Sequence, residues 1–183
     1  MSDNEIETIA KKYRSAIETA RDRHLFNGDK EFIHFPTQCC GLTCSLLAKH
    51  LFDHHGIETL WISTNRDADT HAWLVLKDNR ISGPHFFIPV LDSISTIIKS
   101  YSGTGANELT PIYYKEDIEN GLIIDITADQ FNDFKEKVFV GCDSTFHKSF
   151  DFRGAYENDG INDERLLNLY YIIESMMKDD ITD

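Results

Sequence analysis

Apolar residues recur at a helical period near both ends of the chain. One stripe runs between residues 4 and 22, and a second runs between residues 163 and 178. The pattern predicts an N-terminal helix and a closing C-terminal helix, each with one face turned toward the core. The stripes comprise Ile6, Ile9, Tyr13, Ile17 and Ala20 in the first helix, and Leu166, Leu167, Tyr170, Ile173 and Met177 in the second.

A third helix is predicted after an irregular stretch, residues 25–38, that glycine and proline interrupt. It begins near Cys40 and runs to about His55, where Gly56 is placed to end it. Its buried stripe is expected to comprise Leu46, Leu47, Ala48, Leu51 and Phe52.

The middle of the chain carries four runs with strand character, at residues 58–64, 71–77, 121–127 and 137–141. Between the second and third, residues 90–101 have helical spacing. The strands follow one another with few long helical crossovers, which favours an α+β fold with a mainly antiparallel sheet. A length of 183 residues fits a single domain.

Charge and composition narrow the class of protein. The net charge is −13, and no cluster of Lys and Arg is present, so a nucleic-acid surface is not expected. No apolar run is long enough to span a membrane, and MSDNEIETIAKK lacks the basic start and apolar block of a secretory signal. We therefore predict a cytoplasmic protein, in which the four cysteines are thiols, ligands or catalysts rather than disulfides.

Three of the four cysteines lie close together, in the segment FPTQCCGLTCSLLAKHL. A cysteine at the first turn of a helix has a lowered pKa, because unpaired N–H groups and the helix dipole favour the thiolate. The same N–H groups can bind the oxyanion of acyl transfer. Cys40 is the candidate, and Gly41 would let a substrate approach the backbone closely. Cys39 stays an alternative, and so does burial of all three thiols.

A thiolate nucleophile needs a base, and the base needs an orienting group. His71 opens a predicted strand directly after a polar loop, and Asp125 is a charge within the apolar run LIIDIT. A buried carboxylate is costly unless it is paired, so Asp125 is expected to accept a hydrogen bond from His71 if their strands are neighbours. Asp129 is an alternative acid. His147 is a spare base, although a solvent-facing loop position is preferred for it.

The order of a cysteine at a helix start, His-Ala-Trp on a strand and Asp-x-Thr on the next strand resembles the papain-like, transglutaminase-like superfamily. FPTQCCGLTCSLLAKHL, THAWLVL and GLIIDITADQF are similar to small bacterial transglutaminase-like or papain-like proteins of poorly defined function. The resemblance implies a catalytic triad of Cys40, His71 and Asp125 on that fold. It also implies acyl transfer on amide bonds through a thioester, as in a cysteine protease, deamidase or transglutaminase acting on a protein or peptide substrate.

Two further residues are substrate-site candidates. Gln38 resembles the glutamine just upstream of the nucleophile that donates to the oxyanion in papain-like enzymes, although its spacing from the cysteine is shorter, and surface exposure is the alternative. Trp73 lies two residues beyond His71, on the same face of the strand. Relative to the family, residues 78–119 form an insertion between the two strands, which we expect to cap the cleft.

Two rival interpretations remain. The cysteines could bind a metal together with His50, His54 and His55, but no CxxC pair is present and HLFDHH lacks the glutamate of an HExxH motif, so no metal is predicted. No nucleotide-binding motif is present, and no cofactor is expected. The other rival is a non-catalytic, protein-binding or regulatory protein of the immunity type on the same fold.

Overall fold

The computed structural model of the chain describes residues 1–26, 28–86, 111–158 and 160–179. In chain order the elements are α1 (Asp3–Asp22), η1 (Phe32–His34), α2 (Cys40–His55), β1 (Thr59–Arg66), β2 (Asp69–Leu76), β3 (His85–Phe86), β4 (Pro111–Ile112), α3 (Lys115–Ile118), β5 (Ile123–Asp125), η3 (Ala128–Gln130), β6 (Phe139–Gly141), α4 (Thr145–Lys148), β7 (Asp151–Glu157) and α5 (Glu164–Asp179).

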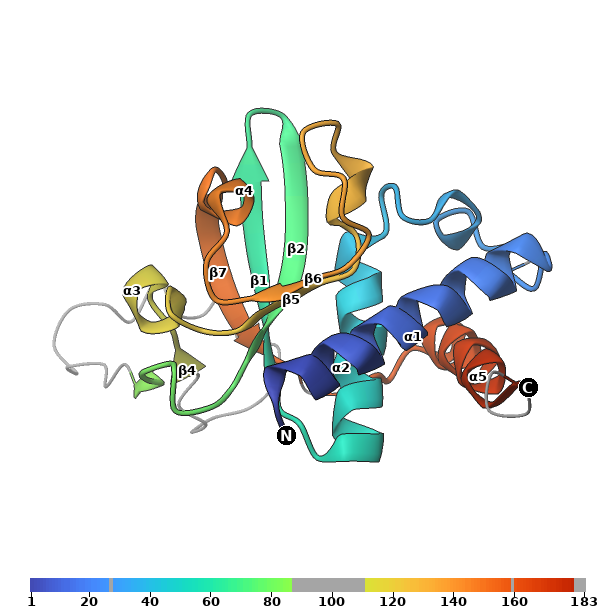
Figure 1. Cartoon of the computed structure of the whole chain (residues 1–183), viewed down its shortest axis with the longest axis horizontal. Helices are drawn as coiled ribbons and strands as arrows, with labels where there is room; N and C mark the ends of the chain where they lie inside the picture. Colours follow the sequence, from blue (N-terminus) through green and yellow to red (C-terminus); the bar gives the residue numbers. More distant parts are fainter. Residues whose placement is uncertain (27, 87–110, 159, 180–183) are drawn as a thin grey trace, which may run out of the picture.

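Five strands form one antiparallel sheet in the order β6-β5-β2-β1-β7 (Figure 1). Its centre is the β1–β2 hairpin, in which Thr59 pairs with Leu76 at one end and Arg66 with Asp69 at the other. The chain therefore has the α+β class and the antiparallel sheet that its pattern predicts. β7 was not predicted, because this edge strand mixes Asp, Arg and Gly with its apolar residues and shows no clean alternation.

The sheet separates two apolar clusters. On one face, Ala72, Leu74 and Leu76 of β2 pack in a large cluster with α1, α2 and α5. On the other face, Trp73 and Val75 pack with residues of α3 and α4. Figure 1 shows the three long helices grouped on one side of the sheet. The alternation of side chains along β2 thus directs neighbouring residues into different layers.

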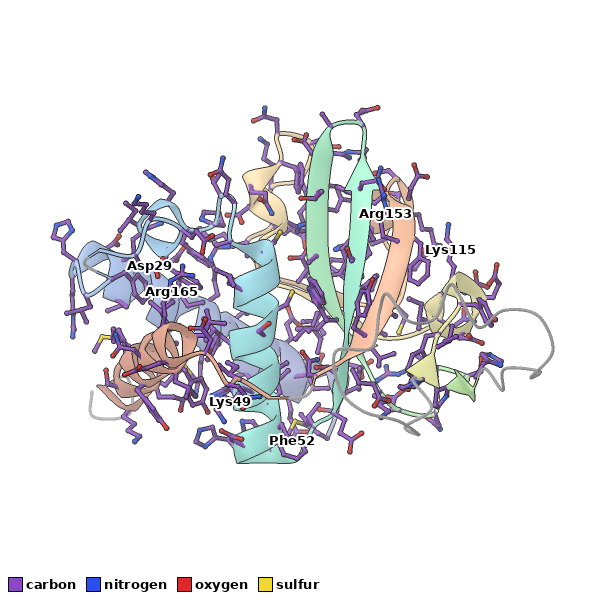
Figure 2. The ribbon with its side chains drawn as sticks, turned by 180° about the vertical axis from the view of Figure 1, so that it is seen from behind. Asp29, Lys49, Phe52, Lys115, Arg153 and Arg165 are labelled. Carbon is purple, nitrogen blue, oxygen red and sulfur yellow. The ribbon has the colours of Figure 1, made fainter. Side chains whose placement is uncertain are left out.

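Helix α2 begins at Cys40 and ends before Gly56, as predicted. Gly56 has a φ of 64°, the left-handed conformation that glycine adopts without steric cost, and it ends the helix there. Phe52 was expected in the buried stripe, but it is 58% exposed (Figure 2). The buried face is narrower than the run of apolar residues suggested.

The described ends of the insertion form a small two-stranded sheet, in which β3 pairs with β4. It contacts the main sheet, because the hydroxyl of Tyr113, the residue after β4, donates to Glu157 of β7 at 2.9 Å. The helix predicted at residues 90–101 lies outside the described residues. None of the described helices combines the length and apolar content needed to cross a lipid bilayer.

A buried arginine fastens α1 to the segment that follows β5. Arg14 is 3% exposed, and its guanidinium donates to both carboxylate oxygens of Asp129 at 2.9 Å and to the carbonyl of Ile126. Asp129, which the sequence offered as an alternative acid, is therefore engaged in an ion pair. The same segment carries Gln130, so Arg14 also fixes one wall of the site described below.

We expect Arg14→Met to lower the free energy of unfolding by about 3 kcal/mol, because it leaves Asp129 and the Ile126 carbonyl without their partner. Urea unfolding followed by circular dichroism measures the change. The matched control is Lys11→Met, which removes an exposed partner of Glu7 on the same helix and should cost less than about 0.5 kcal/mol. Equal losses for the two variants would contradict the structural role of Arg14.

Candidate active site

The Cys40 thiol stands at the first turn of α2. Gln38 adopts a φ of 62°, in the left-handed region, so the chain turns sharply just before Cys39, the N-cap residue. Burial raises the pKa of Cys40, but its interactions with the His71 imidazole and with the backbone N–H groups of Ala72 and Gly41 outweigh burial and lower the pKa below that of an ordinary thiol. The structure thus brings Cys40 and His71 together.

The neighbouring thiols have the opposite character. Cys39 is 2% exposed, its Sγ lies 3.4 Å from the carbonyl oxygen of Pro36, and burial raises its pKa to about 12. Burial also raises the pKa of Cys44 well above the usual range. Cys142 is exposed on the far side of the sheet. Of the clustered cysteines, Cys40 alone combines partial exposure with a stabilised thiolate.

His71 and Asp125 form the hydrogen bond expected of them. β2 and β5 are neighbours, and Leu74 lies opposite Ile124. This register places the side chains of His71 and Asp125 on the same face of the sheet. His71 Nε2 lies 2.7 Å from Asp125 Oδ2, and both residues are 1% exposed. The other imidazole nitrogen, Nδ1, is therefore the one left for contacts outside this pair, and it lies 3.1 Å from the Gln130 side-chain nitrogen.

Electrostatics favour a charged pair at this site. Burial lowers the pKa of His71, but the Asp125 carboxylate and the Cys40 thiolate outweigh it and raise the pKa to about 9. For Asp125, burial opposes the charge, yet His71 and His147 hold its pKa well below the usual range. The backbone N–H and hydroxyl of Thr127 donate to Asp125 Oδ1 at 2.8 and 3.1 Å. These shifts favour thiolate at Cys40 and imidazolium at His71.

A second histidine on Asp125 was missed. His147 was expected to face solvent, but it is 4% exposed, and its Nε2 lies 3.0 Å from Asp125 Oδ2. Its Nδ1 lies 2.6 Å from the Ser144 hydroxyl, which also accepts from the His147 backbone N–H and caps α4. The serine three residues before the histidine, with Phe146 and Phe150 beside it, is the signal that points to a capped, buried turn.

Trp73 does not face the thiol. Its ring is 6% exposed and packs against the rings of His71 and His147, with centroids 5.5 and 4.7 Å apart. It lines a separate, mainly apolar cavity of about 310 Å³ that Cys142 also lines. Trp73 therefore packs against the two histidine rings. This arrangement does not support its prediction as a substrate-binding residue.

The Cys40 thiol opens into a polar cavity of about 620 Å³. Gln38 lines it, and its role toward substrate stays a prediction. Gln130 also lines it, and its side-chain nitrogen lies 3.1 Å from His71 Nδ1. Gln130 was not singled out from the sequence, since nothing in TADQF shows that η3 returns this side chain to the histidine. The remaining lining residues are Thr37, Arg66, Ala68, Asp69, Thr70, Phe131, Asn132 and Asp133.

Gly41 and the insertion at residues 78–119 were also expected to contribute to the site. A Cβ on Gly41 would meet the Trp61 ring at an ordinary 3.5 Å, so packing does not demand glycine there, and its role in substrate approach stays a prediction. The insertion was expected to cap the cleft. None of its described residues, 78–86 and 111–119, lines the cavity at Cys40.

Two groups of side chains in the described residues could hold a metal ion, and neither includes a cysteine. One is His71, Asp125 and His147, whose facing atoms already satisfy one another inside the core. The other is His50, His54 and Glu174, between α2 and α5. The mixed Cys–His site weighed from the sequence is not formed in this part of the chain.

We expect iodoacetamide to modify Cys40 rapidly at neutral pH once the exposed Cys142 has been replaced by serine. Mass spectrometry across a pH series measures the rate. In that background Cys40→Ser should abolish labelling, whereas the matched variant Cys39→Ser should leave it unchanged. His71→Asn should move the labelling midpoint upward by about one pH unit or more, because the thiolate loses its cationic partner. Slow, equal labelling of Cys39 and Cys40 would contradict the assignment.

The expected family membership was compared with known proteins. No protein-family model, curated protein or solved structure matches the chain. The resemblance to the papain-like, transglutaminase-like superfamily therefore stays a prediction, and the site rests on the geometry of this chain.

Proposed function

We propose that the protein is a cysteine-dependent acyl-transfer enzyme acting on amide bonds, with a papain-like or transglutaminase-like core. The observation that supports the proposal is the buried hydrogen bond of 2.7 Å between His71 Nε2 and Asp125 Oδ2. Beside it, interaction between Cys40 and His71 lowers the pKa of the thiol and helps to raise that of the imidazole. A structural histidine–aspartate pair alone would not require a thiol with a lowered pKa at its open end.

In the proposed first step, the Cys40 thiolate attacks the carbonyl carbon of the substrate and a C–S bond forms. The first-turn N–H groups of α2 and the Gln38 side chain are the candidates that bind the developing oxyanion. The His71 imidazolium gives its Nδ1 proton to the leaving nitrogen, the C–N bond breaks, and a thioester remains. Asp125 holds the ring in orientation throughout.

In the second step, an acceptor resolves the thioester. His71, now neutral, takes a proton from the attacking molecule, and the thiolate leaves. The cavity rim at Gln38, Asp69 and Thr70 is exposed, so water reaches the thioester freely. Access of water favours hydrolysis over transfer to an amine, because amine transfer depends on a site that excludes water.

Gln130 contacts His71, with its side-chain nitrogen 3.1 Å from Nδ1. In the thiolate–imidazolium state that the pKa shifts favour, Nδ1–H donates, so the Gln130 amide must turn its oxygen toward the ring or withdraw. After His71 has given up this proton, the Gln130 amide can donate to the lone pair on Nδ1, because Nε2 stays hydrogen-bonded to Asp125. Gln130 thus holds the neutral ring while the thioester is present.

The proposal is tested by incubating the protein with a library of peptides and peptide amides. We expect the wild type to release amine or ammonia and to form a Cys40-linked acyl adduct that mass spectrometry detects after rapid acid quenching. Cys40→Ala should lose product release entirely, while Cys142→Ser keeps it. Full turnover by Cys40→Ala would overturn the mechanism. A wild type that forms no adduct and releases nothing would favour the non-catalytic, protein-binding alternative.

Variants around Asp125 should separate its role from that of His147. Asp125→Asn should lower kcat by about 10³-fold or more, the scale seen when a buried triad aspartate of another enzyme is made neutral. His147→Asn removes one charged hydrogen bond and should cost about tenfold.

Both substitutions should also shift the pH profile of activity. His71 is charged below about pH 9 in the native site, so the alkaline limb lies near that value and should move to lower pH as Asp125 loses charge or orientation. The exposed His34→Ala is the control. A normal pH profile for both variants would show that Asp125 does not act through His71.

A further inference from the structure

Three ligand-bearing side chains meet at the end of α2 that is remote from Cys40. His50 and His54 lie one turn apart on α2, and Glu174 reaches them from α5. His50 Nδ1 lies 2.6 Å from Glu174 Oε1, and His54 Nε2 lies 2.8 Å from Glu174 Oε2. His50 and Glu174 are 4% and 8% exposed, whereas the His54 side chain is 45% exposed. The group is anchored inside and open to solvent on one side.

We infer that His50, His54 and Glu174 bind one divalent transition-metal ion of the zinc class. Their ligand atoms all lie within 4.8 Å of one another. Two imidazoles and one carboxylate form a common donor set for zinc, with a fourth position left for water. The two imidazoles contact different oxygens of the one carboxylate, so Glu174 stands beside both rings.

The present spacing requires a small adjustment to admit an ion. Ligands about 2.1 Å from a tetrahedral zinc lie roughly 3.4 Å from each other, and the present contacts are hydrogen bonds of 2.6 and 2.8 Å. The His50–Glu174 contact must therefore lengthen by roughly 0.8 Å and the His54–Glu174 contact by roughly 0.6 Å. The exposed His54 ring can turn to lengthen its contact, and the buried contact with His50 requires a rotation of the Glu174 side chain.

A metal site needs neutral imidazoles and an ionised carboxylate, so ion binding displaces protons from these side chains. Without an ion, His50 Nδ1 donates to the Glu174 carboxylate, because an ionised carboxylate only accepts hydrogen bonds. Among the described residues, His50 Nε2 is buried without a hydrogen-bond partner, so no contact there opposes a proton on Nε2 when an ion binds Nδ1. The missing hydrogen bond at His50 Nε2 also limits the affinity for the metal ion, since a hydrogen bond to the second ring nitrogen strengthens a histidine ligand.

Nearby charges do not block the ion. Lys49, which lies between α2 and α5 (Figure 2), is paired with Asp53 at 2.9 Å and stacks over Tyr170.

The ion would not take part in chemistry at Cys40. His50 follows Cys40 by ten residues, so the two lie about 15 Å apart along the helix axis. Its effect would be mechanical, because it joins the last turns of α2 to α5 and so steadies the helix that presents the thiol. The sequence did not predict this site, since the carboxylate comes from residue 174 rather than from the HLFDHH segment.

The test titrates the full chain with Co²⁺, whose visible absorption reports tetrahedral nitrogen and oxygen ligands, followed by competition with Zn²⁺. A Cys40→Ser, Cys142→Ser background removes the reachable thiols. We expect one equivalent of Co²⁺ to bind. His54→Ala and Glu174→Gln should each weaken binding at least about tenfold, and the exposed His34→Ala should not change it.

Zn²⁺ should also raise the melting temperature of the background protein, and His54→Ala should abolish that rise. His54 is half-exposed, so this variant is expected to fold even if Glu174→Gln does not. The inference is overturned if His54→Ala binds Co²⁺ as tightly as the background protein. It is also overturned if no absorption change occurs up to 1 mM Co²⁺, about the weakest affinity of a useful site. Neither outcome depends on whether Cys40 is catalytic.

Discussion

The arrangement of this protein depends on one buried carboxylate. Asp125 is 1% exposed, and a charge at that depth persists only if hydrogen bonds replace the water it has lost. His71 from β2, His147 from α4 and Thr127 from the following turn supply them. Three separate parts of the chain therefore converge on two oxygen atoms. That convergence fixes β2 beside β5 and holds α4 against the sheet.

Helix α2 connects this centre to the rest of the molecule. Its positive end supports an anionic thiol, and its negative end carries histidines beside an acid from α5. The buried stripe between the two ends of α2 packs on the sheet. Packing in the core, rather than a loop, therefore sets the orientation of the thiol. A nucleophile placed on a rigid element keeps its geometry without a partner bound.

Much of this was predictable from the sequence because it follows from local pattern. Periodicity located α1, α2 and α5, and Gly56 marked the end of α2. The position of Asp125 within an apolar strand predicted that its carboxylate has a hydrogen-bond partner. His71, at the start of another predicted strand, is that partner. These features need only the side-chain period of an element and the cost of burying a charge.

What could not be predicted depends on contacts between distant segments. The sequence favoured a loop position for His147 because Phe134 and Phe139, which pack against its ring, precede α4 in the chain. Trp73 was predicted as a substrate residue because its packing partners His147 and Phe150 come later in the chain. Gln130 contacts His71 from the segment after β5, which Arg14 on the first helix holds through Ile126 and Asp129. Long-range pairing decides these positions, and a local pattern carries no record of it.

The burial of Cys39 has a consequence for oxidation. A sulfenic acid formed on Cys40 is normally rescued by an ionised thiol nearby, which closes a reducible disulfide. Cys39 is adjacent in sequence but is held as a protonated thiol against the Pro36 carbonyl, and Cys44 is likewise un-ionised in the core. The three clustered cysteines therefore form no self-protecting pair, and oxidation at Cys40 would advance to irreversible products unless an external thiol reaches the cavity first.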